Sequence, residues 1–138
     1  MIKYKFDTDE KDFIKICTLY QMARWWQGTC SSEQIARMIS GSLCFLTAWQ
    51  EDQLVGMGRA ISDSSDDAYL QDIFVDKNYR KQGIATNIIN RLTDYCLSKN
   101  INWIALIATP GSVDLYEKSG FKKMPDHTPM QFYEKPNF

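Results

Sequence analysis

One stretch of the sequence, Tyr69 to Ala85, combines features that suit the binding of a phosphate group. A strand predicted from Leu70 to Val75 leads into a loop, residues 76–82, with three basic side chains and one acidic one. Gly83 then opens the strongest helical pattern in the chain. The first turn of a helix presents unpaired N–H groups and the positive end of the helix dipole, and both attract an anion. Because Gly83 has no Cβ, its backbone can lie close to a ligand, so the stretch predicts a phosphate site.

The spacing within this loop excludes two common phosphate-binding motifs and matches a third. The P-loop pattern GxxxxGK[ST] does not occur, and Gly56-Met57-Gly58 falls inside a predicted strand, where it cannot form a dinucleotide-binding turn. The loop sequence Arg80-x-x-Gly83-x-Ala85 resembles the R/Q-x-x-G-x-G/A signature of the GCN5-related N-acetyltransferases, or GNATs. A second segment, Leu115 to Phe121, reads LYEKSGF and resembles their recurring LYEKxGF sequence. The first motif alone could be a basic turn that caps an ordinary helix, but the two motifs in this order make the chain similar to a GNAT along essentially its whole length.

The resemblance implies that the phosphate ligand is acetyl-coenzyme A (acetyl-CoA), the acyl donor of this family. The strand before the loop would bind the pantetheine arm through its backbone, and the loop amides would hold the pyrophosphate. Thr109 stands where the family often has an asparagine, and Ser112 replaces the usual small apolar residue. Lys77 and Lys81 could pair with the adenosine-side phosphate or remain solvated. The implied donor-binding residues are Ile73, Phe74, Val75, Arg80, Lys81, Gln82, Gly83, Ile84, Ala85, Thr86, Thr109, Ser112 and Tyr116.

Two side chains are candidates for the proton transfers of an acetyl transfer. Attack of an amine on a thioester expels a thiolate, and the resemblance implies Tyr116 as the phenol that protonates it. The alternative for Tyr116 is packing against Phe121. The amine must itself lose a proton, and Asp72 is the leading general base, because a carboxylate within an apolar strand is costly unless it has a role. The alternative for Asp72 is a structural partner for a buried amide or for Arg59. Weaker candidates for the base are Glu33, Asp66 and His127.

The acceptor is expected to bind near the end of the first helix. Trp25 and Trp26 are adjacent, so both cannot face the core, and one is expected in a cleft where it could stack on an aromatic or cationic acceptor. A packing wedge or a dimer contact is the alternative. Isolated acids could supply negative charge for an amine, namely Glu33, Asp66, Asp67 and Asp126.

The leading hypothesis is an enzyme that transfers acetyl from acetyl-CoA to a primary amine of a small molecule, peptide or protein, by direct attack in a ternary complex. No cysteine lies in either motif segment, so a cysteine relay is not supported. Two alternatives stay open: a non-catalytic coenzyme A-binding sensor or structural module, and an enzyme that uses a longer acyl-CoA. A homodimer is also possible in this family, and Trp25, Phe132 and Phe138 could serve its interface.

Hydrophobic periodicity predicts the elements that must place these residues. Strands are expected at residues 2–6, 43–50, 54–61, 68–75, 101–108, 121–124 and 130–134, and helices at about 9–24, 32–40, 83–98 and 113–119. Thr8 or Asp9 could cap the first helix, and Ser31 or Ser32 the second. Short polar loops between successive strands fit an antiparallel meander. We therefore expect a single domain over residues 1–138 with an α/β (α+β type) GNAT fold. It would have one mixed, mostly antiparallel sheet of six to seven strands and about four flanking helices.

Composition argues against several classes of binding partner. The chain has 138 residues with 16 basic and 17 acidic side chains, so it lacks the basic excess of a nucleic-acid binder. Its apolar stretches are too short to cross a bilayer and its first residues do not read as a signal peptide, so a cytoplasmic protein with no membrane partner is expected. The four cysteines are widely spaced, which makes a metal site improbable and favours reduced core thiols.

Overall fold

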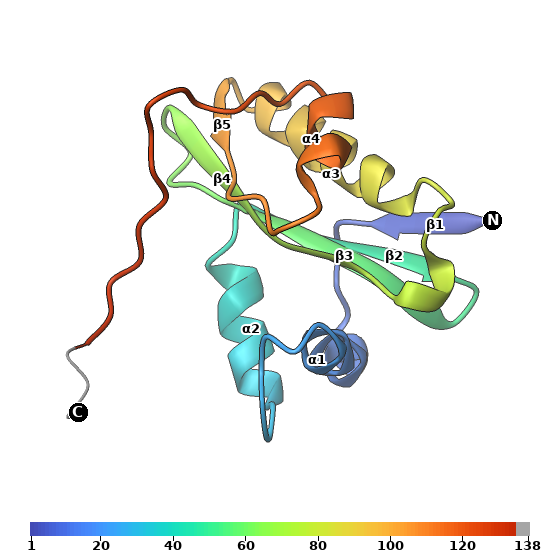
Figure 1. Ribbon diagram of the computed structural model, residues 1–138. Coiled ribbons are helices and arrows are strands. Elements are labelled where there is room, and N and C mark those ends of the chain that lie inside the picture. The colour runs from blue at the N-terminus through green and yellow to red at the C-terminus, as the bar shows by residue number, and fades with distance from the viewer. Residues whose placement is uncertain (135–138) are drawn as a thin grey trace.

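The computed structural model describes residues 1–134 as one sheet with helices on both faces (Figure 1). The strands are β1 (Ile2–Lys5), β2 (Cys44–Gln50), β3 (Gln53–Ile61), β4 (Asp67–Val75) and β5 (Trp103–Ala105). The helices are α1 (Phe13–Met22), α2 (Ser32–Ser40), α3 (Ile84–Ser98) and α4 (Val113–Lys118), with short 3-10 helices η1 (Glu10–Asp12) and η2 (Lys77–Tyr79).

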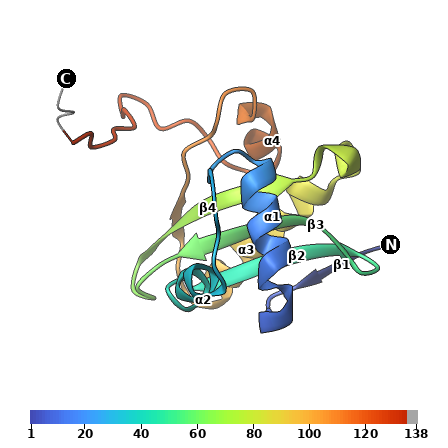
Figure 2. The ribbon, with the colours of Figure 1, turned by 90° about the horizontal axis from the view of Figure 1, so that it is seen from below.

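The sheet has the order β1-β2-β3-β4-β5. The pairs from β1 to β4 are antiparallel, and β5 joins β4 in parallel, so the sheet is mixed and mostly antiparallel as predicted. Helix α3 is the crossover that a parallel β4–β5 pair requires. Figure 2 shows α1 and α2 lying across the face of the sheet opposite α3. The α+β class and the helix count are therefore confirmed.

The two faces of the sheet each pack on their own apolar cluster, because alternate side chains of a strand point to opposite faces. Cys44, Leu46 and Ala48 of β2 face the cluster under α3, whereas Phe45 and Trp49 face the cluster under α1 and α2. Helix α3 contributes a buried stripe to the first cluster: Ile84, Ile88, Ile89, Leu92 and Cys96. Burial on both sides fixes the register of the central strands.

The helix starts follow the predicted caps. The Asp9 carboxylate accepts a hydrogen bond from the Lys11 N–H and caps η1, which runs directly into α1. The Ser31 hydroxyl accepts from the Gln34 N–H at 3.2 Å and caps α2. These bonds satisfy N–H groups that a helix start leaves unpaired.

The C-terminal part of the sheet differs from the prediction. β5 covers three residues rather than eight, and no strand forms after α4 within residues 1–134, so the sheet has five strands rather than six or seven. The segments 121–124 and 130–134 have the expected apolar composition but no strand partner in the single chain. Figure 1 shows the chain after α4 passing over β5 and then running away from the body.

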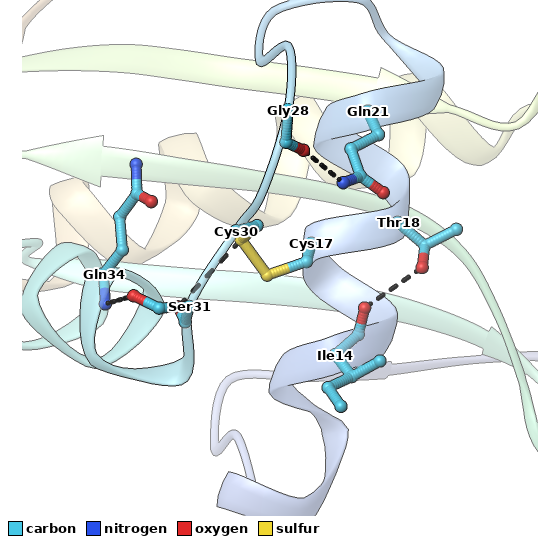
Figure 3. Close-up of a disulfide and its surroundings, with 8 residues drawn as sticks. All are labelled: Ile14, Cys17, Thr18, Gln21, Gly28, Cys30, Ser31 and Gln34. Atoms are coloured by element: carbon cyan, nitrogen blue, oxygen red, sulfur yellow. Dashed lines mark hydrogen bonds between the residues drawn. A yellow bond between two sulfur atoms is a disulfide. The ribbon is translucent and has the colours of Figure 1, made fainter.

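The expectation that all four cysteines are reduced is wrong for two of them. Cys17 of α1 forms a disulfide with Cys30, across a sequence separation of 13 residues (Figure 3). The loop after α1 folds back along that helix, and the Gln21 side-chain amide donates a hydrogen bond to the Gly28 carbonyl at 3.0 Å. The spacing of the cysteines did not indicate that this loop folds back along α1. Cys44 and Cys96 are free and buried.

Candidate functional site

A groove of about 660 Å³ lies where the end of β4, the start of α3 and the start of α4 meet. Its floor includes Ile73, Phe74 and Val75 of β4. The segment from Arg80 to Thr86 forms one wall, apart from Gln82, and residues 109–112 with Leu115 and Tyr116 form another. Two segments that are some thirty residues apart in the sequence thus share one hollow.

The groove exists because β4 continues well beyond its pairing with the short strand β5. Their ladder joins Asp67–Tyr69 to Trp103–Ala105 and ends there. Ile73, Phe74 and Val75 lie beyond the ladder, so their backbone groups on the β5 side are available to a ligand. A free backbone edge at this place is what the resemblance implied for binding of the pantetheine arm.

A β-bulge in β4 lies just before the groove floor. Arg59 pairs with Gln71 and Met57 pairs with Phe74, so Gly58 alone faces both Asp72 and Ile73. Asp72 has a left-handed backbone with φ 58°, a conformation that aspartate tolerates better than most residues. A Cβ at Gly58 would lie 2.8 Å from the Ile88 side chain, so glycine is required where α3 packs on the bulge.

Two donors hold the Asp72 side chain on the α1 face of the sheet. The Tyr20 hydroxyl donates to Asp72 Oδ2 at 2.7 Å, and Arg59 Nε donates to the same oxygen at 2.8 Å. Burial, together with the negative charge of Asp72, raises the pKa of Tyr20, so its phenol remains a donor. Asp72 does not line the groove. The Arg59 contact that the sequence left as an alternative is therefore present.

The loop before α3 has the geometry of an anion site. Lys81 and Gly83 both have left-handed backbones, with φ 65° and 80°, a pattern that turns successive N–H groups toward one side. Arg80 Nε donates to the Val75 carbonyl at 3.0 Å, and its guanidinium lies over the Phe74 ring at 5.6 Å. The Arg80 side chain is thereby held beside the helix N-terminus, where its charge adds to the helix dipole.

Tyr116 lies in the short helix α4 with its side chain half-buried in the groove wall. Burial raises the pKa of its phenol, so the neutral, proton-carrying form is favoured at neutral pH. Its ring meets Phe121 edge-on at 6.1 Å, and its carbonyl accepts hydrogen bonds from Ser119 and Phe121. Tyr116 therefore both packs against Phe121 and lines the groove.

The side chains of the two adjacent tryptophans point in different directions, as expected for neighbouring residues. Trp25 lines the groove, remains 42% exposed and meets Phe74 edge-on at 5.9 Å. Trp26 turns inward and stacks on Tyr20 with ring centroids 4.1 Å apart. Trp26 therefore does not face the groove, but it supports the tyrosine that holds Asp72.

Most of the residues predicted for the site meet in one place. Fourteen residues were assigned to donor binding or to catalysis, and all of these except Gln82 and Asp72 line the groove. Lys77 lies in η2, away from the lining. Sequence reasoning missed the groove residues Pro110, Gly111 and Leu115, although Leu115 lies inside the second motif. It also missed Tyr20, which in the sequence is only one more apolar position of the α1 stripe.

No metal is indicated by the part of the chain that the structure describes. Residues 1–134 contain no group of three or more His, Cys, Asp or Glu side chains that could hold an ion. No helix among them is both long and apolar enough to span a membrane.

Comparison with known proteins agrees with this geometry. The profile of the Acetyltransferase (GNAT) domain family matches residues 12–133. GCN5-related N-acetyltransferase 2, chloroplastic, of Arabidopsis thaliana is 36% identical over 77 residues, which are 56% of this chain and 30% of that protein. Histone acetyltransferase TAP1 of Glycine max is 34% identical over 77 residues, which are 56% of this chain and 33% of that protein. The match thus spans about a third of the length of these curated relatives.

Solved structures extend the likeness over almost the whole chain. SA2161 from Staphylococcus aureus, described as a "Probable Acetyltransferase", has a TM-score of 0.81 and 26% identity, with 97% of this chain and 100% of that chain covered. A "predicted acetyltransferase" from Clostridium acetobutylicum, solved with acetyl-CoA, has a TM-score of 0.74 and 18% identity, with 95% of this chain and 96% of that chain covered, and shows the shared fold. The family profile covers most of the chain, and both family motifs lie on the one groove, so the chain belongs to the GNAT acetyltransferase family.

Proposed function

We propose that residues 1–138 act as one domain that transfers an acetyl group from acetyl-CoA to a primary amine of a small molecule or a peptide. The observation that carries the proposal is the groove, where a helix N-terminus with two cationic neighbours and a half-buried tyrosine face one hollow. Membership of the family supports the reaction class. The solved relative with acetyl-CoA supports the donor.

The residues of the groove fit a polyphosphate with a long amide arm. The N–H groups of the first α3 turn and the charges of Arg80 and Lys81 would hold the pyrophosphate. A Cβ built at Gly83 meets no atom closer than 4.0 Å, so the helix start is open to a ligand. The free backbone edge of Ile73 to Val75 would pair with the amides of the pantetheine, as an added strand would.

Acetyl-CoA supplies an activated acyl carbon and a thiolate leaving group. Tyr116 would donate its phenolic proton to the departing sulfur as the C–S bond breaks and the new C–N bond forms. Its raised pKa keeps that proton available at neutral pH. Solvent would then return a proton to the phenolate.

Trp25 and Phe74 would form the entrance for the acceptor. Both aromatic rings lie at the groove, and an aromatic face attracts an ammonium group before it loses its proton. Among the described residues that line the groove, none is a carboxylate. We therefore assign the removal of the amine proton to water rather than to a side chain in direct contact.

Asp72 is assigned a positioning role. Its Oδ2 already accepts from Tyr20 and Arg59, and it lies at the bulge that sets the path of Ile73 to Val75. Loss of this carboxylate would release the bulge and shift the backbone that binds the donor. Asp72 would thus affect the reaction by fixing the strand that binds the donor, and would not take the proton of the amine.

Calorimetric titration with acetyl-CoA tests the donor site. The change Gly83→Glu puts a carboxylate at the pyrophosphate position, and we expect affinity to fall by about 100-fold or more, since two like charges would be forced together. Gly83→Asn controls for the left-handed backbone, which asparagine tolerates, and should keep much of the affinity. Asn90→Glu adds the same charge on an exposed position of α3 outside the groove and should bind as the wild type does. Equal binding by all four proteins would overturn the site.

A further inference from the structure

A second hollow, of about 670 Å³, lies along the outer edge of the sheet, and we call it the edge pocket. One wall is β5 with the chain that follows it, and the other is the segment after α4, which passes over β5 in Figure 1. Its large apolar side chains are open to solvent, with Trp103 43% exposed, Ile107 71% and Met124 45%. A mostly apolar hollow of this size with a few polar groups is typical of a site for a small ligand.

The edge pocket adjoins the donor groove. Tyr116 lines both of them. Their walls are also continuous along the chain, because Ala108 lines the edge pocket and Thr109 lines the groove. In α4, Val113 lines the pocket and Leu115 the groove. A molecule whose amine reaches Tyr116 can therefore keep the rest of its body in the edge pocket.

The edge pocket opens on the face of the sheet that α1 and α2 cover. Ala68 and Leu70 of β4 face the cluster under α3, so Tyr69 between them points to the other face. There the Tyr69 ring meets Trp103 edge-on at 5.7 Å. Phe74, at the proposed entrance for the acceptor, packs on the cluster under α1 and α2. The pocket and the entrance thus lie on the same face.

The charged side chains of the edge pocket are basic. Lys122 and Lys123 line it, together with His127, whose Nδ1 lies 2.7 Å from the Pro125 carbonyl oxygen. Within residues 1–134 neither lysine forms an ion pair, and none of the described lining residues is a carboxylate. The acids that the sequence suggested for attracting an amine line neither hollow: Glu33, Asp66, Asp67 and Asp126.

This charge decides between two kinds of acceptor. The exposed aromatic rings alone would suit a second ammonium group. The two lysines oppose such a group, because like charges repel and no lining carboxylate offsets them. In the groove, the donor phosphates would neutralise Arg80 and Lys81, so Lys122 and Lys123 are the basic charges left for the acceptor. A negatively charged group is therefore favoured at this end.

We propose that the acceptor is an amine with an apolar body that ends in a carboxylate. The amine would lie at Tyr116, the body against Trp103 and Ile107, and the carboxylate beside Lys122 and Lys123. An amine that carries a second positive charge would be rejected by the same two lysines. The assignment of this ligand as the acceptor rests on the proposed acetyl transfer, whereas its binding in the edge pocket does not.

Three amines built on one ring test the proposal with the wild-type protein. They are phenethylamine, the same amine with a carboxylate para on the ring, and the same amine with an aminomethyl group in that place. Thiol release from acetyl-CoA gives kcat/KM for each. We expect the carboxylate compound to exceed phenethylamine by about 10-fold and the aminomethyl compound to fall below it by a similar factor. Equal values for the three amines, or a preference for the aminomethyl compound, would overturn the proposal.

Removal of the two lysine charges tests which residues set the preference. In Lys122→Gln with Lys123→Gln, the ratio of kcat/KM for the carboxylate compound to that for phenethylamine should fall to about one. Lys3→Gln with Lys99→Gln is the matched control, because it removes two exposed charges outside both hollows and should keep the wild-type ratio. A wild-type ratio in the Lys122 and Lys123 variant would contradict the assignment.

A carboxylate added to the pocket should reverse the preference. Ile107 is 71% exposed, so Ile107→Glu changes the charge of the pocket without disturbing the core. We expect this variant to prefer the aminomethyl compound over the carboxylate compound. Ile14→Glu, at a position 72% exposed on α1 and outside both hollows, is the matched control and should behave as the wild type does. No change of preference in Ile107→Glu would count against the proposal.

Binding without chemistry separates this inference from the proposed acetyl transfer. With coenzyme A in place of acetyl-CoA, nuclear magnetic resonance can follow the indole N–H of Trp103, assigned with Trp103→Phe. The carboxylate compound should shift this signal at a lower concentration than phenethylamine does. If it does so and no amine releases thiol, the acetyl transfer fails while the pocket assignment stands. A Trp103 signal that the carboxylate compound leaves unmoved would overturn the inference, whether or not thiol is released.

Discussion

At the scale of single residues, Tyr116 carries the chemical step of the account. We predict that Tyr116→Phe lowers kcat by about 100-fold, because the leaving thiolate loses its proton donor. The affinity for acetyl-CoA should change little, since the ring and its edge-on contact with Phe121 remain. Steady-state kinetics with calorimetry separates the two effects. Tyr95→Phe, on α3 and packed on Phe6 away from the groove, is the matched control and should keep wild-type rates.

The pH profile offers a second check on the same residue. Burial raises the pKa of Tyr116, so the active protonated form persists as the pH rises and is lost only above the ordinary tyrosine value of about 10. The fall of kcat on the alkaline side should therefore begin above that pH in the wild type. If Tyr116→Phe keeps both the wild-type rate and the same alkaline fall, the tyrosine is not the acid.

Asp72 provides a prediction that separates a positioning residue from a general base. Asp72→Asn removes the negative charge that pairs with Arg59 and leaves a neutral amide oxygen as a weaker acceptor, so it should lower the free energy of unfolding by about 2 kcal/mol. It should also raise the KM for acetyl-CoA by disturbing the bulge. Tyr20→Phe keeps the carboxylate but removes one of the bonds, so it should move both quantities in the same direction by a smaller amount.

The acidic side of the pH–rate profile decides the role of Asp72. If water takes the amine proton, that side keeps its position in Asp72→Asn, since no base has been lost. A profile that loses its acidic limb in Asp72→Asn but keeps it in Tyr20→Phe would show that the carboxylate is the base.

Sequence alone pointed to the cost of a carboxylate in an apolar strand. The donors could not be read from it, because Tyr20 lies 52 positions away and looks like a core residue.

At the scale of elements, the Cys17–Cys30 disulfide ties α1 to the loop that presents Trp25. Cross-links that close a loop of this size contribute about 3 kcal/mol in the chain-entropy account, so Cys17→Ser with Cys30→Ser should lower the free energy of unfolding by about that amount. The freed loop should also raise the KM for the acceptor while leaving acetyl-CoA binding unchanged. Denaturant titration and kinetics measure the two effects.

Thiol titration checks the pairing itself. The unfolded, unreduced chain should show two reactive thiols, Cys44 and Cys96, and the reduced chain all four. In the folded chain Cys44 should not react, because burial, with the nearby Cys96, raises the pKa of its thiol to about 12. Four thiols without reduction would contradict the disulfide, and the double serine variant should then match the wild type in stability.

The elements that could be predicted are those that depend only on residues within one segment of the chain. The α3 stripe, the Ser31 cap and the meander from β2 to β4 each depend on local periodicity or turn chemistry, and each is observed. The two predicted C-terminal strands do not form among the described residues, because a strand also needs a pairing partner, and periodicity within residues 121–124 and 130–134 does not show whether one is reached. The bulge at Asp72 likewise depends on how β3 and α3 pack, which periodicity in β4 alone does not show.

At the scale of the whole molecule, the sheet acts as a scaffold that brings two distant motifs to one opening. The first motif follows β4 and the second starts within α4, and the short β4–β5 ladder leaves the space between them free. The groove was therefore predictable from the motifs, since both belong to the same family pattern. Which tryptophan lines the groove was not predictable, because Trp25 and Trp26 are equivalent in the sequence and only the packing of Tyr20 turns Trp26 inward.

The most direct test of the account is the release of coenzyme A thiol by the wild-type protein with acetyl-CoA and a panel of amines. The panel would hold a polyamine, an aminoglycoside and a peptide with a free amine, and mass spectrometry would follow the amine. We predict thiol release that needs both substrates and matches one acetyl group gained by the amine. Acetyl-CoA that binds at the groove without thiol release from any amine would contradict the account and would instead indicate a coenzyme A-binding module.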